Sequence, residues 1–102
     1  MGRSPKRFIK NVLIQIEYGT QVRSASGASV ESLEVDEGAN LADAVRLLVE
    51  QRRELLQRWF TADYRPRAGL LIFVNDQTPS SLELTPLRAG DQIALMTLVS
   101  GG

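Results

Sequence analysis

The chain contains neither cysteine nor histidine among its 102 residues. Without cysteine there is no disulfide, thiolate nucleophile or cysteine-based metal site, and without histidine the commonest general base and metal ligand is missing. The acidic residues are scattered, and the one dense group, Glu34-Val35-Asp36-Glu37, lacks the ligand spacing of a calcium loop. We therefore expect no metal site, and we interpret the acidic group as a solvated turn.

Long apolar runs are also missing. No run approaches the ~20 residues that cross a bilayer, and no signal-type apolar stretch follows the basic N-terminus. The hydrophobic share of 43% and the charged share of 24% are typical of a folded soluble domain. A chain of this length suits one domain with one modest core. We expect a cytoplasmic protein that does not associate with membranes.

The formal net charge of zero hides an uneven distribution. Arg3, Lys6, Arg7 and Lys10 place +4 in the first ten residues, so the other 8 basic and 12 acidic side chains leave the body at −4. A body of this charge is not a nucleic-acid surface. We expect residues 1–10 to form a flexible basic tail that aids solubility, rather than a phosphate-binding arm.

Two strands are predicted before any helix. Over residues 11–18 every second side chain from Val12 onward is apolar, which is the period of a half-buried strand. Residues 30–35 repeat the pattern with Leu33 and Val35 inward, and the Gly- and Ser-rich segment between the two suits a hairpin. The two strands are expected to pair in antiparallel fashion.

A helix is predicted to begin after Asn40. Its side chain can accept a hydrogen bond from a first-turn N–H, and Asp43 adds negative charge near the positive end of the helix dipole. Apolar residues recur at three- and four-residue spacing over 41–49 and resume over 55–59. The polar stretch 51–54 between them allows one long helix or two helices with a break near residue 52. We interpret the apolar stripe as core rather than as a groove for a partner.

Three further strands are predicted. Residues 70–74 are apolar at every position, which indicates a central strand covered on both faces, or one covered on one face and used for binding on the other. Residues 82–84 suggest a short edge strand, and 92–98 form the last strand. There Ile93 and Leu95 face one side and Ala94 and Met96 the other. The pattern predicts an α+β domain in which a mixed sheet of four to five strands packs over one main helix, with the first and last strands parallel.

Three segments carry a family resemblance: the strand and turn Leu71-Ile72-Phe73-Val74-Asn75, the turn Leu87-Arg88-Ala89-Gly90-Asp91-Gln92-Ile93, and the terminal Val99-Ser100-Gly101-Gly102. Together they resemble the C-terminal third of the MoaD, ThiS and ubiquitin-related-modifier families, which are ubiquitin-like β-grasp proteins. The segment Leu95-Met96-Thr97-Leu98-Val99 lacks the aromatic and proline-rich approach common in molybdopterin synthase small subunits, and it is closer to the ubiquitin-related modifiers. The resemblance implies a β-grasp domain over residues 11–96 and an extended tail over residues 97–102.

The resemblance also implies a carrier or modifier protein that is not itself an enzyme. In such families an adenylating enzyme of the ubiquitin-activating type consumes ATP to join the C-terminal carboxylate to AMP, and the carrier binds no cofactor of its own. Here the covalent attachment point would be Gly102, and the activation tail would be Leu98, Val99, Ser100, Gly101 and Gly102. Because glycine lacks Cβ, Gly101 and Gly102 can pass through a narrow cleft. Extended, residues 97–102 span on the order of 20 Å.

An outward face of the last two strands is expected to dock the partner. We assign the partner surface to Ile72, Val74, Ala94, Met96 and Arg88; in the other register Leu71 and Phe73 would stand beside Met96 and Ala94. An apolar strand packed on a single helix cannot bury both faces, and exposed apolar patches mark partner sites.

Two functions follow from the resemblance. In a sulfur carrier, a sulfurtransferase would convert activated Gly102 to a thiocarboxylate. The sulfur would serve a pathway such as molybdopterin synthesis or tRNA thiolation, and in the former a molybdopterin synthase large subunit would be a partner. In a protein modifier, a conjugating enzyme would pass Gly102 to lysines of target proteins. The only lysines of the chain are Lys6 and Lys10, so the body offers none for chain building, which favours a carrier or a single-copy modifier. A binding module with an accidental Gly-Gly end is the third alternative.

Overall fold

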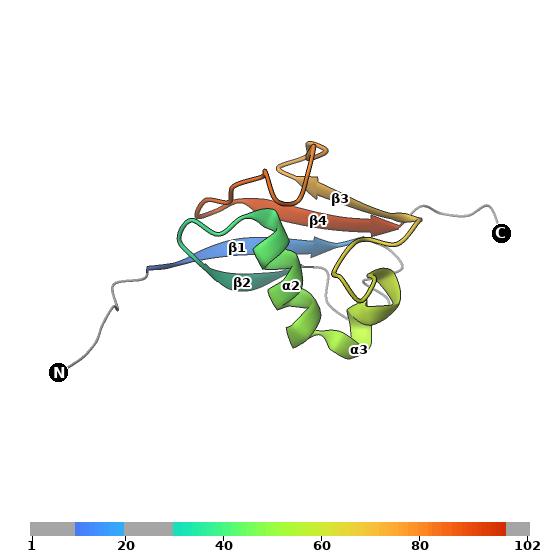
Figure 1. Cartoon of the computed structure of the whole chain (residues 1–102). Helices are drawn as coiled ribbons and strands as arrows, with labels where there is room; N and C mark the ends of the chain where they lie inside the picture. Colours follow the sequence, from blue (N-terminus) through green and yellow to red (C-terminus); the bar gives the residue numbers. More distant parts are fainter. Residues whose placement is uncertain (1–9, 20–29, 98–102) are drawn as a thin grey trace.

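The computed structural model describes residues 10–19 and 30–97. Four strands and a broken helix follow one another in the order β1 (Asn11–Tyr18), β2 (Val30–Asp36), α2 (Leu41–Gln51), α3 (Arg53–Leu56), a 3₁₀ turn (Gln57–Trp59), β3 (Leu70–Val74) and β4 (Gln92–Thr97). Helix α2 lies across one face of the sheet, and α3 with the segment that follows it lies toward the end at which β4 stops (Figure 1). This is the predicted ubiquitin-like β-grasp fold.

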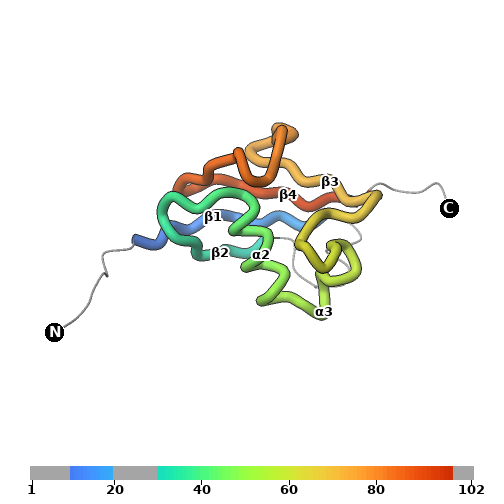
Figure 2. Tube along the Cα trace, in the orientation of Figure 1, coloured from blue at the N-terminus to red at the C-terminus, as the bar shows by residue number. Residues whose placement is uncertain are grey.

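The sheet has the strand order β2-β1-β4-β3. Strands β1 and β2 are antiparallel, and β1 and β4 run parallel in the middle of the sheet, as predicted. The tube in Figure 2 shows why: α2 and the segments after it carry the chain back across the sheet before β3 and β4 are added. The prediction that residues 70–74 form a central strand is wrong: β3 lies at the edge of the sheet, where its strand neighbour is β4.

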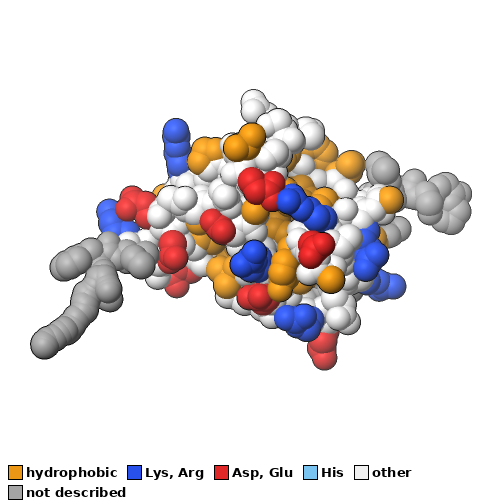
Figure 3. Space-filling model, viewed as in Figure 1, with side chains coloured by type: hydrophobic (Ala, Val, Ile, Leu, Met, Phe, Trp, Pro, Cys, Tyr) orange, Lys and Arg blue, Asp and Glu red, His pale blue; other side chains and the backbone are white. Residues whose placement is uncertain are grey.

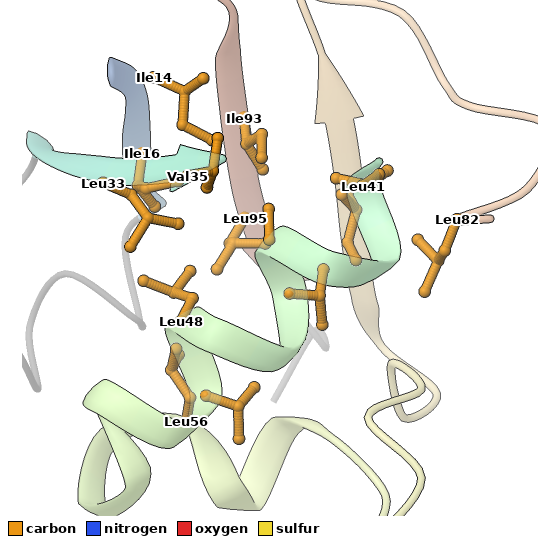
Figure 4. Packing of buried hydrophobic residues seen from close by; sticks show 14 of the residues in the cluster. Ile14, Ile16, Leu33, Val35, Leu41, Leu48, Leu56, Leu82, Ile93 and Leu95 are labelled. Carbon is orange, nitrogen blue, oxygen red and sulfur yellow. The ribbon is translucent and has the colours of Figure 1, made fainter. Parts of the chain in front are cut away.

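The core lies between α2 and the inner face of the sheet. Strand residues Ile14, Ile16, Leu33 and Leu95 point toward Leu48 and its neighbours on the helix (Figure 4). Each of these side chains is at most 3% exposed. Apolar burial at about 25 cal/mol per Å² is the dominant favourable term for a domain of this size. The predicted inward faces of β1, β2, α2 and β4 are all confirmed.

The helix begins and breaks for local reasons. Asn40 accepts a hydrogen bond from the Asp43 N–H at 2.8 Å, and the Asp43 carboxylate accepts one from the Asn40 N–H at 3.1 Å, which forms a reciprocal cap. At Arg52 the backbone leaves the helical region, with φ −123° and ψ 47°. The Arg52 guanidinium forms an ion pair with Glu31 of β2, which holds the chain at this break. Of the two alternatives, the broken helix is therefore correct.

The predicted short strand at residues 82–84 is wrong. Ser81 ties this segment into a turn, because its Oγ accepts from the Leu84 N–H at 3.0 Å and its carbonyl accepts from the Thr85 hydroxyl at 2.6 Å. Serine often competes with ladder hydrogen bonds in this way. Leu82 instead reaches the core.

In the described ranges, no helix is long and apolar enough to span a bilayer.

Candidate functional site: an outer sheet patch beside the tail exit

The register between β3 and β4 determines which apolar side chains face outward. Leu71 lies opposite Met96, and Phe73 lies opposite Ala94. Side chains that face each other across an antiparallel pair stand on the same side of the sheet. Since Leu95 between Ala94 and Met96 is fully buried beneath α2, these four residues form one cluster on the opposite face. We call Leu71, Phe73, Ala94 and Met96 the outer patch.

The outer patch is apolar and incompletely covered. Leu71 is 38% exposed, Phe73 and Met96 are half-buried, and Ala94 is 7% exposed. Met96 lies over Gly19 at the end of β1, where an added Cβ would stand 2.6 Å from the Met96 Sδ. We did not single out Gly19 from the sequence. Side chains alternate along β1, and Glu17 was expected to face outward. The residue two positions further on, Gly19, could therefore have been placed on this face.

Two residues that we assigned to the partner surface belong to the core side. Ile72 pairs with Leu95 and Val74 with Ile93, and both partners are buried. Ile72 is itself 8% exposed within the core, and Val74 packs against the core. The prediction that Ile72 and Val74 line the outer face is therefore wrong. The error arises from the strand register. Successive side chains of a strand point to opposite faces, and because Ile72 lies opposite Leu95, it cannot share a face with Met96.

Arg88 also lies away from the outer patch. It stands in the turn before β4, where its N–H donates to the Asp91 carboxylate at 2.7 Å. The neighbouring Gly90 N–H binds the Leu13 carbonyl near the start of β1. The length of β4 therefore separates Arg88 from Met96 and Thr97. The structure brings together Ala94 and Met96 of the predicted surface with Leu71 and Phe73, as in the alternative register, and leaves out the other three.

A groove of about 470 Å³ continues the outer patch around the edge of the sheet. It runs between β3, including Leu71 and Phe73, and the segment 78–83. Arg65 and Glu83 form an ion pair at its rim. The hydrogen bond from Arg65 holds the pKa of the Glu83 carboxyl below its usual value. The apolar surface available to a partner is thus wider than four side chains.

The outer patch adjoins the point where the chain leaves the sheet. Thr97, which we assigned to the tail, is still in β4 and pairs with Leu70. Met96 immediately precedes it. The five residues of the predicted activation tail, 98–102, lie outside the described residues. We call the Leu70–Thr97 end of the sheet the tail exit.

A hydrogen-bonded cluster braces this end on the core side. The Tyr18 hydroxyl and the Arg52 guanidinium both donate to the Glu31 carboxylate. The pKa of the Tyr18 phenol is raised well above its usual value. Burial is the largest cause, and the hydrogen bond to Glu31 is the second. Burial acts to raise the pKa of Glu31, but the hydrogen bonds from Arg52 and Tyr18 outweigh it, and the pKa lies below its usual value. The cluster joins β1, β2 and the helix break. The hydrophobic periodicity of the sequence did not predict it, because that pattern carries no information on contacts between polar side chains.

Within the described ranges, no three Asp or Glu side chains gather in a way that could hold a metal ion. What the described residues of the site present is an apolar surface beside a strand end.

Solved structures with this fold include archaeal and bacterial proteins. SAMP1 from Haloferax volcanii is 26% identical, with a TM-score of 0.77 over 88% of this chain and 99% of that chain. A putative molybdopterin converting factor subunit 1 from Pyrococcus furiosus is 21% identical, with a TM-score of 0.66 over 86% and 99%. A chain of the Amycolatopsis orientalis BexX/CysO complex is 20% identical, with a TM-score of 0.64 over 87% and 99%. The latter two likenesses are of fold alone.

No curated protein matches the sequence. The model of the ThiS family, by contrast, matches residues 16–102, a span that begins within β1 and takes in the helix, the outer patch, the tail exit and the Gly-Gly end. With the strand order, the parallel central pair and this match in agreement, the chain belongs to the ThiS family of small ubiquitin-like carrier and modifier proteins.

Proposed function

We propose that the chain is a sulfur carrier whose working group is the Gly102 carboxylate. The observation that carries the proposal is the outer patch placed directly beside the strand end from which the chain runs on to Gly101-Gly102. An adenylating partner would dock on this apolar patch and receive the tail. The proposed setting is the cytoplasm, with ATP bound by the partner and no cofactor bound by the carrier.

The chemistry requires activation because a carboxylate has no usable leaving group. The Gly102 carboxylate attacks the α-phosphorus of ATP, which forms an acyl-adenylate and releases pyrophosphate. The terminal sulfur of a sulfurtransferase persulfide then attacks the acyl carbon, and AMP leaves. A second thiol of the partner attacks the resulting acyl disulfide, which releases the thiocarboxylate and leaves a disulfide in the partner. With no cysteine of its own, the chain can hold the sulfur covalently only at its C-terminus.

The length of the tail suits this transfer. Five residues after Thr97 reach about 17 Å when extended, at 3.3–3.6 Å per residue. A partner docked on the outer patch therefore has its active site within reach of Gly102. Two complexes with this fold bear on the kind of partner: molybdopterin-converting factor subunits 1 and 2 from Helicobacter pylori, and BexX/CysO from Amycolatopsis orientalis. We propose an enzyme partner for the outer patch by analogy with them.

The second candidate function is conjugation of Gly102 to lysines of target proteins. It is favoured by the likeness, at 26% identity, to SAMP1 of Haloferax volcanii, a small archaeal modifier protein. The same patch and tail would serve, with a conjugating enzyme in place of the sulfurtransferase. Since residues 11–102 contain no lysine, a modifier of this kind would be attached singly or through Lys6 or Lys10.

The test of the carboxylate mechanism alters only the end of the chain. Deletion of Gly102, or addition of one alanine after it, is expected to abolish ATP–pyrophosphate exchange by the adenylating enzyme from the same organism. Circular dichroism melts of both variants should match that of the parent chain. Undiminished exchange by either variant would show that activation does not depend on Gly102 as the terminal residue, and would overturn the assignment of Gly102 as the working group.

A mass measurement separates the two functions. The carrier isolated from its host should contain a fraction about 16 Da heavier than the free acid, from replacement of one oxygen by sulfur, and alkaline hydrolysis should remove it. A modifier should instead give conjugates whose tryptic lysine remnant is the segment 89–102, because Arg88 is the last arginine. Conjugates that persist without the sulfurtransferase, with no heavy fraction at any stage, would replace the carrier function by the modifier function.

A further inference from the structure

Positive charge gathers in one part of the described chain. Residues 46–69 contain six arginines and three acidic residues, whereas residues 31–43 contain five acidic residues and no basic one. Residues 70–97 carry one arginine, Arg88, against three acidic residues. The body as a whole is acidic, so the arginine-rich segment is a local reversal of its charge.

This segment lies at the tail exit. The Arg67 carbonyl accepts a hydrogen bond from the Leu70 N–H at 3.1 Å, and Leu70 pairs with Thr97 at the end of β4. Figure 1 shows α3 and the segment that follows it at this end of the sheet, and Figure 3 shows basic side chains gathered there. A protein that receives Gly102 must come within about 17 Å of Thr97, and this is the end of the sheet at which Arg67 lies.

Two of the arginines line one hollow of about 340 Å³. They are Arg53, at the start of α3, and Arg67, with Val49, Phe60 and Tyr64 among the other lining residues. Neither arginine has an ion-pair partner among the described residues, where Arg52 binds Glu31 and Arg65 binds Glu83. The hollow therefore presents two exposed arginines, with the partly exposed Tyr64 and the polar side chains of Gln57 and Thr61 beside them.

The walls of the hollow are held in place by the chain itself. The Arg67 Nε donates to the Phe60 carbonyl at 3.1 Å, and its main-chain N–H donates to the Trp59 carbonyl at 2.8 Å. Tyr64 adopts a φ of 62°, a left-handed conformation that is costly for a bulky residue. Its hydroxyl donates to the Glu50 carboxylate at 2.9 Å. This fixed arrangement reduces the ordering cost of binding an anion.

We propose that this hollow receives an aspartate or glutamate side chain of the enzyme that takes the tail, and that it selects partners with an acidic rim. Arg53 and Arg67 would face the carboxylate, while its aliphatic stem would lie against the partly exposed Tyr64. Guanidinium groups match carboxylate geometry, and complementary charge acts mainly on association and partner choice. The inference rests on the proposed function for the identity of the partner, and on the described residues alone for the chemistry of the hollow.

The central variant is Arg53→Glu. Arg53 is exposed and begins α3, where a negative charge is compatible with the helix dipole, so the fold should be retained. The matched control is Lys10→Glu, which makes the same change in net charge before β1, away from the tail exit. In pyrophosphate exchange we expect Arg53→Glu to raise the KM for the carrier roughly fivefold to tenfold, more at low salt than at high salt, and Lys10→Glu to leave it unchanged.

A second measurement does not depend on activation. In an NMR titration of the ¹⁵N-labelled chain with a hexaglutamate peptide, amide shifts should concentrate at residue 53 and at 60–67, and Arg53→Glu should remove them. Equal effects of the two variants would overturn the proposal in favour of net charge. Inorganic phosphate that shifts these amides while the peptide does not would assign the hollow to phosphate instead. If the enzyme fails to activate the parent chain, the proposed function fails, and the titration still decides the chemistry of the hollow.

Discussion

The two faces of strand β4 are similar in composition and differ in what covers them. Ile93 and Leu95 face α2 and are 1% and 0% exposed. Ala94 and Met96 face the other way, toward Leu71, Phe73 and Gly19, with no helix above them in the described part of the chain. The comparison shows that the composition of a strand can reveal two apolar faces. It does not reveal which face packs in the core and which is left for a partner.

The largest expected difference between the faces comes from adding a charge. Leu95→Asp should unfold the domain, because an unpaired carboxylate in the core together with the lost leucine packing costs upwards of about 5 kcal/mol, comparable with the whole stability of a small domain. Met96→Asp should remain folded, since a carboxylate on the outer face can reach water, and should weaken partner docking. Thermal melts followed by circular dichroism test both. Two equally unfolded proteins would show that the outer patch is covered in solution.

Neighbouring residues of β3 allow the same comparison by truncation. Ile72→Ala should cost about 2–4 kcal/mol, because it leaves a cavity in the core. Leu71→Ala should cost less than about 1 kcal/mol, since Leu71 is already 38% exposed. Urea denaturation of the two variants measures the difference. Equal losses would contradict the register between β3 and β4 on which the outer patch depends.

Gly19 tests how closely the outer patch is packed. An added Cβ would lie 2.6 Å from the Met96 Sδ and 3.1 Å from the Leu95 carbonyl oxygen. Gly19→Ala should therefore cost about 1–2 kcal/mol through local overpacking. Met96→Ala in the same chain should restore part of the loss, because the sulfur contact disappears and the backbone contact does not. A double-mutant cycle in urea measures this coupling, and strict additivity would mean that Met96 does not lie over Gly19.

The smallest effect is expected on the core side, at Glu31. Its pKa is lowered in the folded state, so its contribution to stability is present above its unfolded value of 4.5 and is lost as the pH falls through the folded pKa. The parent chain should lose about 1 kcal/mol more than Glu31→Gln between pH 6 and pH 3. Urea midpoints at the two pH values give the difference. Parallel acid losses would indicate that Arg52 and Tyr18 do not favour the charged form of Glu31.

Much of the fold could be predicted from local patterns. The alternation from Val12 to Tyr18 gave the bounds and the inward face of β1, and Asn40 with Asp43 gave the start of α2. The segment 82–84 misled, because three residues of alternating character fit a strand as well as a turn, and the hydrogen bonds of Ser81 decide between them. The pattern 51–54 allowed a helix break without requiring it, since the contact that stabilises the break lies 21 residues away, at Glu31.

The sequence by itself determined that β3 and β4 each carry two apolar faces, that no thiol or imidazole is present, and that Gly101-Gly102 follows the last strand. The tertiary structure decided that Leu71 and Phe73, not Ile72 and Val74, stand beside Met96, and that Arg53 and Arg67 share a hollow near the tail exit. The reason is physical. The alternation of side chains is local, whereas the face that becomes the core depends on strand register and on where α2 packs, and both are set by contacts between residues far apart in the chain.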